Sequence, residues 1–118
     1  MSGHPHDNVI REKAYAFALS TMRIWRELRG LGEYDLSRQL FKAGTSIGAN
    51  VEEAQAAQSR ADFLSKMSIA SKEAREAHYY WLNLIADDEH LRRIAAPRAE
   101  CDEIVRILTA IVKSTGES

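Results

Sequence analysis

The chain has 118 residues, of which 45% are hydrophobic and 28% are charged, and its formal net charge at pH 7 is −1. This length and composition are typical of a single globular domain, here expected to span residues 1–118. No apolar run could span a membrane and no secretory signal is recognisable, so we expect a cytoplasmic protein without a membrane partner. The single cysteine, Cys101, excludes an internal disulfide framework. A net charge near zero gives no overall attraction for nucleic acid, although charged patches can still exist.

Proline and glycine, the strongest helix breakers, are rare, which predicts an all-α chain. The first helix is expected over residues 8–29, and Gly30 and Gly32 end it. Its apolar residues recur at intervals of three and four and therefore share one helix face. That face comprises Ile10, Ala14, Phe17, Thr21, Ile24 and Leu28.

The second helix is expected over residues 35–57 and contains two glycines, Gly44 and Gly48, one turn apart. Each glycine costs about 1 kcal/mol relative to alanine inside a helix. Without a preceding strand or a phosphate-binding pattern, the pair is better interpreted as a smooth helix contact than as a ligand loop. Thr45 and Ser46 are expected to bond to the preceding turn. The inward stripe comprises Leu36, Leu40, Ala43, Ile47 and Ala54, with Val51 at its edge.

The third helix is expected over residues 60–88, because Ser59 and Asp62 have the spacing of a capping box. Its apolar residues alternate between steps of four and three, as in the seam of a helical bundle. The predicted seam comprises Phe63, Met67, Ala70, Ala74, Ala77, Trp81 and Leu84. Ile69 and Tyr80 lie outside this seam, near two glutamates, and are candidate helix or subunit contacts.

The fourth helix is expected over residues 97–114, because proline is favoured in the first helical turn. Residues 1–7 and 115–118 are expected to be flexible. The inward residues are Cys101, Ile104, Leu108 and Ile111, with Val105 and Val112 beside them. Four helices with short connections predict an antiparallel up-down four-helix bundle.

The candidate reactive groups all have simpler structural interpretations. His4 and His6 lie in a terminal segment, where such a pair is usually incidental. Asp87 and His90 have a spacing seen in carboxylate-bridged metal bundles, but those sites need two Glu-x-x-His pairs. We therefore expect no metal or cofactor.

Nothing in the sequence identifies a catalytic group. His78 is expected to be a partly buried polar residue beside the seam, and Cys101 a small buried hydrophobe rather than a nucleophile. No pair of carboxylates can be singled out for general acid–base work, since most acidic residues fall on outward helix positions. We therefore expect no catalytic residues and no enzymatic activity.

Charge is distributed unevenly along the chain. Residues 8–30 contain five basic and two acidic residues, a net charge of +3, whereas residues 59–90 have a net charge of −2. A solvated face is the simplest explanation of the basic stripe. Two functional alternatives remain, which are attraction of phosphate backbones and subunit pairing of the basic first helix with the acidic third helix. The candidate nucleic-acid or partner surface comprises Arg11, Arg23, Arg26 and Arg29.

Short motifs in the second and third helices resemble those of the bacterial 23S ribosomal RNA intervening-sequence proteins. The motifs are SIGANVEEA at 46–54, DF at 62–63, SIA at 68–70 and EARE at 73–76, and the first and last helices are similar as well. The shared residues are Gln39, Ala43, Ser46, Ile47, Ala49, Asn50, Glu53, Ala54, Phe63, Ile69, Ala70 and Glu76. The chain departs from the family where Phe41 and Lys42 replace a frequent pair of arginines, and where Gly48 replaces a frequent proline.

The resemblance implies a four-helix bundle that assembles as a homopentameric ring and has no established enzymatic activity. A related branch, the accessory variability determinant of diversity-generating retroelements, binds a reverse transcriptase and nucleic acid. We therefore expect a noncatalytic oligomeric scaffold or adaptor that binds protein or nucleic acid. The alternative is an RNA-processing factor or an enzyme with an unrecognised active site. Asn50 and Glu53 are predicted to form structural hydrogen bonds between helices or between subunits.

Overall fold

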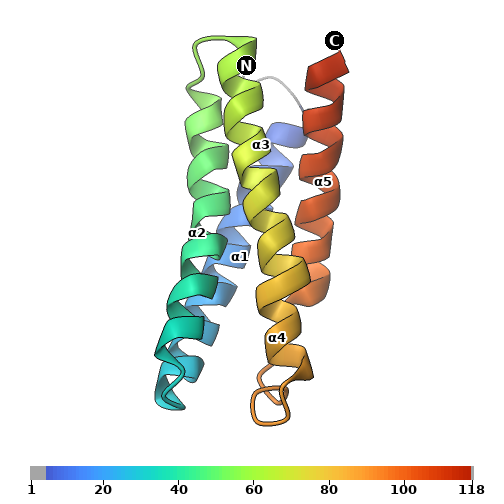
Figure 1. The fold of residues 1–118 in the computed structure, drawn as a ribbon. Helices are drawn as coiled ribbons and strands as arrows, with labels where there is room; N and C mark the ends of the chain where they lie inside the picture. Colours follow the sequence, from blue (N-terminus) through green and yellow to red (C-terminus); the bar gives the residue numbers. More distant parts are fainter. Residues whose placement is uncertain (1–4, 118) are drawn as a thin grey trace.

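The computed structural model describes residues 5–117, with side chains from Val9 onward, and all regular structure in this part of the chain is helical. In Figure 1, α3, a π-helical turn (η1) and α4 form one continuous rod, and it packs beside α1, α2 and α5 so that rods consecutive in the chain run antiparallel. The all-α prediction is therefore confirmed. The elements are α1 (Pro5–Gly30), α2 (Tyr34–Gln55), α3 (Arg60–Glu76), η1 (Ala77–Trp81), α4 (Leu82–Asp87) and α5 (Arg98–Glu117).

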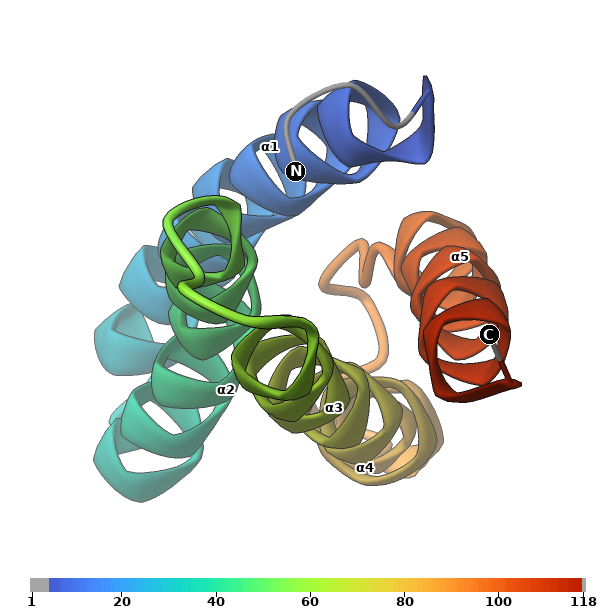
Figure 2. The same ribbon diagram turned by 90° about the horizontal axis from the view of Figure 1, so that it is seen from above.

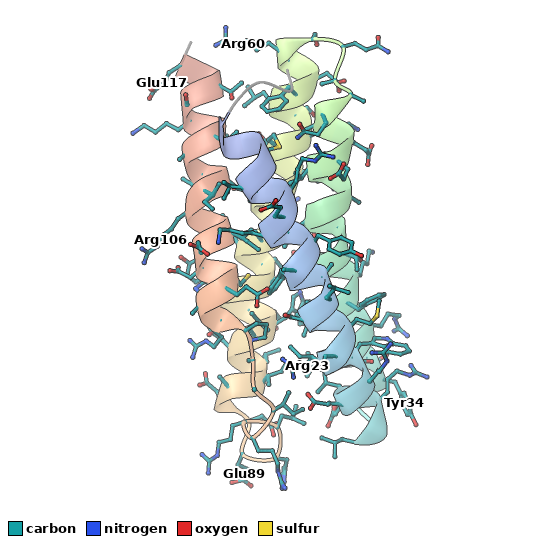
Figure 3. All side chains as sticks on the ribbon, turned by 180° about the vertical axis from the view of Figure 1, so that it is seen from behind. Arg23, Tyr34, Arg60, Glu89, Arg106 and Glu117 are labelled. Atoms are coloured by element: carbon teal, nitrogen blue, oxygen red, sulfur yellow. The ribbon has the colours of Figure 1, made fainter. Side chains whose placement is uncertain are left out.

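The helix ends differ from the predicted flexible termini. Residues 5–7 already belong to α1, and α5 continues to Glu117, whereas residues 1–4 and 118 lie outside the described part. The last turn of α5 is held by Arg60, whose Nε donates a hydrogen bond of 3.1 Å to the carbonyl of Thr115. Figure 3 shows Arg60 and Glu117 at the same end of the bundle. The last helix is therefore longer than predicted, because a residue of α3 satisfies a carbonyl that sequence inspection leaves unpaired, and the flexibility of the tail stays a prediction.

The turns between the helices follow their local chemistry. Gly32 has φ +81°, a left-handed conformation that suits glycine, in the turn between α1 and α2. Before α3, the Asp62 amide donates to Ser59 Oγ at 3.0 Å, and the Gln58 amide donates to Asp62 Oδ2 at 3.3 Å. This cap begins α3 at Arg60, the predicted position.

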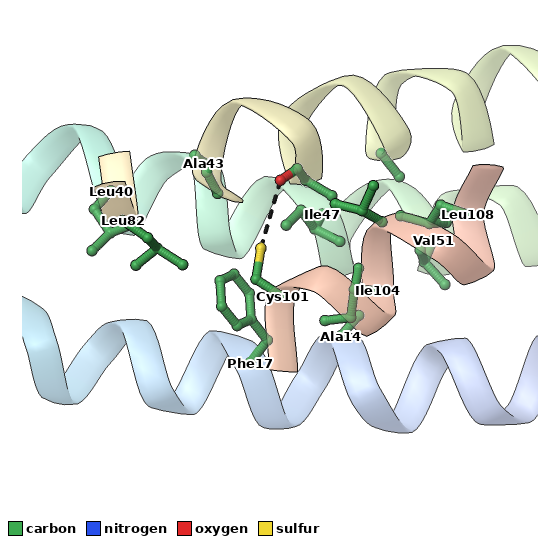
Figure 4. Packing of buried hydrophobic residues seen from close by; sticks show 14 of the residues in the cluster. Ala14, Phe17, Leu40, Ala43, Ile47, Val51, Leu82, Cys101, Ile104 and Leu108 are labelled. Atoms are coloured by element: carbon green, nitrogen blue, oxygen red, sulfur yellow. Dashed lines mark hydrogen bonds between the residues drawn. The ribbon is translucent and has the colours of Figure 1, made fainter. Parts of the chain in front are cut away.

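The core lies between the four rods, and all six inward residues predicted for the first helix are buried. Figure 4 shows how Phe17 of α1 meets residues of the other rods, including Cys101 of α5. The two buried hydroxyls bond within their own helix, since Thr21 donates to the Ala18 carbonyl and Ser37 donates to the Tyr34 carbonyl, each at 2.8 Å. Their burial therefore leaves no unsatisfied hydroxyl.

The two glycines of α2 have different surroundings. A Cβ atom at Gly44 would lie 2.5 Å from Cγ2 and 2.8 Å from Oγ1 of Thr21, which is a steric overlap. A Cβ atom at Gly48 would lie 3.8 Å from its nearest neighbours in Ala14, an ordinary van der Waals contact. The predicted close helix contact therefore requires glycine at Gly44 and does not require it at Gly48.

The π-helical turn η1 shifts the inward face of the third rod. The Leu82 amide donates to the carbonyl of Ala77, five residues earlier, where an α-helix would use an interval of four. Upstream of this turn the predicted seam is buried from Phe63 to Ala77. Downstream, Leu82 and Ile85 are fully buried, whereas Trp81 is half-buried and Leu84 is exposed. The predicted seam is therefore wrong after Ala77, because the residues that face the core lie one position later in the sequence than predicted.

Candidate interaction surfaces

Cys101 is enclosed in the core and carries a neutral thiol. Its side chain is fully buried, and Sγ donates to the carbonyl of Ala74 at 3.5 Å (Figure 4). Burial, with smaller contributions from the neighbouring carboxylates of Glu100 and Asp102, raises the pKa of Cys101 to about 12. The Cys101 side chain therefore contributes to the packing of the core.

Native Cys101 is expected to react with an aromatic disulfide reagent at pH 8 at least about 100-fold more slowly than the urea-unfolded chain, because only a thiolate attacks. The reaction can be followed by the absorbance of the released thiolate, and Cys101→Ser supplies the blank. Equal rates in native and unfolded protein would show that the thiol is accessible and ionised.

The histidines are dispersed. His78 Nε2 lies 3.6 Å from Asp102 Oδ1, and Arg106 also contacts Asp102 at 2.9 Å, so His78 joins η1 to α5. Asp87 and His90 are both exposed at the end of the third rod, and His90 lies 3.6 Å from Glu89 instead. The side chains of His4 and His6 lie outside the described residues. Within the described part, no three His, Cys, Asp or Glu side chains are grouped as a metal site would need.

Most of the candidate arginines on α1 already have partners. Arg11 forms a bidentate pair with Glu52 of α2, with N–O distances of 2.9 and 3.1 Å. Arg29 lies over the rings of Trp25 and Tyr34, 4.9 Å from each centroid. Both side chains are therefore directed toward α2.

Arg23 lies on the other edge of α1, toward the loop that precedes α5 (Figure 3). Its guanidinium contacts Glu27 at 3.2 Å and donates to the Ala95 carbonyl at 3.0 Å. Arg26 is exposed and has no recorded partner among the described residues. The structure therefore divides the predicted basic stripe between two edges of α1 and leaves Arg26 between them.

Asn50 and Glu53, the two residues of the α2 motif that were predicted to be structural, make different contacts. Asn50 Nδ2 donates to the Ser46 carbonyl at 2.9 Å and lies 3.2 Å from Ser46 Oγ, so these bonds stay within α2. The prediction that Asn50 bonds to another helix is wrong within this chain, because its amide reaches back one turn. Glu53 forms an ion pair of 3.3 Å with Lys66, which connects α2 to α3. A subunit contact by either residue stays a prediction.

Large apolar side chains are exposed along the third rod. The exposed fractions are 40% for Ile69, 56% for Tyr80 and 43% for Leu84. Glu76 accepts a hydrogen bond of 3.0 Å from Trp81 Nε1, which fixes the edge of this surface. Partial burial and the negative charge of Glu76 raise the pKa of Glu73. We call this surface the α3–α4 face, and it comprises Ile69, Glu73, Glu76, Tyr80 and Leu84.

Leu84 also lines an open groove of about 430 Å³ between the third rod and the start of α2. Apolar side chains form one part of its wall and carboxylates form another. The groove is lined by Glu33, Asp35, Leu36, Gln39, Trp81, Leu84, Asp88 and Leu91. It therefore extends the α3–α4 face toward α2. Sequence reasoning missed Leu84 as a surface residue because it placed Leu84 in the seam.

A second exposed apolar surface lies on α1. Tyr15 is 69% exposed and Leu19 is 52% exposed, while Met22 is partly buried. Together with Arg26, these residues follow one another at intervals of four, three and four along the outward side of the helix. We call this surface the α1 face, and it comprises Tyr15, Leu19, Met22 and Arg26. Sequence reasoning missed Leu19, although its spacing from Tyr15 was a usable signal.

These observations define the class of the protein, an antiparallel four-helix bundle with exposed apolar surface on two of its rods. No helix in the described residues combines the length and apolarity needed to cross a membrane. The model of the 23S rRNA-intervening sequence protein family matches residues 6–110, and the chain belongs to this family.

A solved structure supports both the fold and the family. It is that of a protein from the S23 ribosomal protein family of Bacteroides thetaiotaomicron VPI-5482, described as a protein of unknown function. The two chains are 39% identical, and the match covers 92% of this chain and 98% of that chain with a TM-score of 0.83. No functionally curated protein matches the chain. The family and the fold of the chain are therefore established, and neither match identifies an activity.

Proposed function

We propose that this protein is a noncatalytic scaffold or adaptor that works as a homo-oligomer. The observation that carries the proposal is the exposed apolar surface on α3, η1 and α4, where Ile69, Tyr80 and Leu84 remain accessible on a bundle whose core is already filled. Large apolar side chains that are exposed together on one face, here beside Glu73 and Glu76, are typical of interaction sites in folded proteins. Self-association would cover this surface and repeat the remaining surfaces of the chain around the assembly.

The proposed number of copies is five. This number is supported by the resemblance of the family motifs, which implies a homopentameric ring. The proposed cytoplasmic location is supported by the single cysteine, Cys101, which is a free thiol and fits a reducing compartment.

The contacts of the candidate arginines favour a protein, rather than a nucleic acid, as the partner. Groups of the same chain already contact the guanidinium groups of Arg11, Arg23 and Arg29. Nonspecific nucleic-acid binding needs several basic side chains directed at phosphates. A salt-sensitive shift of labelled RNA or DNA that disappears when Arg23, Arg26 and Arg29 are changed to glutamate would instead support a nucleic-acid adaptor.

Self-association can be tested with a matched pair of variants. Ile69→Lys places a charge in the α3–α4 face and is expected to convert the oligomer to monomers at micromolar concentration, as measured by light scattering after gel filtration. Ala110→Lys places the same charge at an exposed position of α5 and is expected to leave the mass unchanged. A monomeric unmodified chain would overturn the proposal, as would an Ile69→Lys variant that still assembles like the control.

A further inference from the structure

We infer that the α1 face of one copy packs against the α3–α4 face of the next copy, so that two different surfaces of the chain form each interface. This inference rests on the proposed self-association and specifies which surfaces meet. Three observations support it, namely the positions of the two faces on the bundle, their relative heights and their chemistry.

The two faces lie on diagonally opposite rods. Figure 2 shows the bundle from above, with α1 and α3 separated by α2 on one side and by α5 on the other. Outward surfaces on opposite rods cannot both be covered by one neighbouring copy. Each copy would therefore contact two neighbours, one through each face, which is the head-to-tail arrangement that generates rings.

The two faces also lie at the same height. Ser20 Oγ donates to Glu100 of α5 at 3.3 Å, and the Ala74 carbonyl accepts from Cys101, the next residue of α5, at 3.5 Å. Ser20 of α1 and Ala74 of α3 are therefore level with one another. The two rods run in the same direction (Figure 1), so equal steps along their α-helical parts reach similar heights. Six residues further on, Arg26 lies near the height of Tyr80, which belongs to the π-helical turn.

This alignment means that a rotation about an axis parallel to the bundle brings the two faces together without a shift along the axis. Met22 is then level with Glu76, and Tyr15 is level with Ile69. A cyclic assembly needs such a match, because each copy must present both faces to its neighbours at one height.

The chemistry of the faces is complementary. The α1 face presents apolar side chains with one cation at its end, and Arg26 has no recorded partner among the described residues. The α3–α4 face presents apolar side chains beside two carboxylates, Glu73 and Glu76, and partial burial together with the charge of Glu76 raises the pKa of Glu73. A guanidinium between Glu76 and the ring of Tyr80 would satisfy a carboxylate and an aromatic face together. Two α1 faces or two α3–α4 faces would bring like charges together instead.

A mixing experiment tests this pairing. Leu19→Glu disables the α1 face and leaves the α3–α4 face intact, whereas Tyr80→Glu does the reverse. Both residues are more than half exposed, so both variants are expected to fold, which circular dichroism and thermal unfolding can verify. Each variant alone is expected to be a monomer in sedimentation velocity. A 1:1 mixture is expected to form a heterodimer, because the intact α3–α4 face of Leu19→Glu can pack against the intact α1 face of Tyr80→Glu. The heterodimer is not expected to grow, because its two other faces are the disabled ones.

The other outcomes separate this inference from the proposed function. If the unmodified chain assembles but Leu19→Glu also assembles, the α1 face is not part of the interface and the inference is overturned while self-association stands. A mixture that stays monomeric would also overturn the pairing. A monomeric unmodified chain would overturn both.

Discussion

Leu82→Ala is expected to lower the free energy of unfolding by about 2–5 kcal/mol, whereas Leu84→Ala is expected to lower it by less than about 1 kcal/mol. The two changes remove the same atoms from residues two positions apart. Leu82 is fully buried in the core, whereas Leu84 is 43% exposed. The difference arises from the π-helical turn, which places Leu82 rather than Leu84 on the inward side of the third rod.

Urea unfolding followed by circular dichroism measures both variants. Leu84 also belongs to the α3–α4 face, so each unfolding midpoint should be determined at two protein concentrations. A midpoint that does not change with concentration reports packing within the chain, and a midpoint that changes reports association. Larger destabilisation by Leu84→Ala than by Leu82→Ala would show that the rod is a regular α-helix and that the register shift is absent.

Gly44→Ala is expected to destabilise the protein by about 1–3 kcal/mol, in the range seen for overpacked cores. The new Cβ atom would lie 2.5 Å from Thr21 Cγ2. Thr21 cannot easily move away, because it is fully buried and its hydroxyl donates to the Ala18 carbonyl at 2.8 Å. Thermal or urea unfolding measures the loss.

Gly48→Ala is the matched control in the same helix. Its Cβ atom would make ordinary contacts at 3.8 Å, so the helix propensity of alanine is expected to stabilise the protein by up to about 1 kcal/mol. Thr21→Ala combined with Gly44→Ala should be less destabilising than the sum of the single changes, since the overlapping methyl and hydroxyl are gone. Equal effects at the two glycines, or strict additivity with Thr21, would show that α1 and α2 do not approach closely at Gly44.

The core was predictable from sequence wherever one regular period holds. The first helix buries the six residues that its spacing selects, from Ile10 to Leu28, because their series continues without a break over about five turns of the helix, whereas the second apolar series, Tyr15, Leu19 and Met22, is shorter. The third rod offers two series after Ala77, one through Trp81 and Leu84 and another through Leu82 and Ile85. Both are apolar, so hydrophobicity alone does not select between them, and the π-helical turn selects the second.

The candidate surfaces were predictable only in part, because a helix projection gives directions and not partners. It places Ile69 and Tyr80 outside the seam, where the structure also has them. It does not reveal that Arg11 reaches Glu52, or that Arg23 reaches the carbonyl of Ala95, since these residues are distant in the sequence. Only the packed bundle shows that Arg26 is the candidate arginine that remains without a recorded partner among the described residues.

The central claim is that the exposed apolar surface of this bundle mediates its self-association. Sedimentation velocity of the unmodified chain at micromolar concentration tests this claim most directly, because it needs no variant and no knowledge of a partner. We predict a single species with a mass near that of five chains. A species with the mass of one chain would contradict the account.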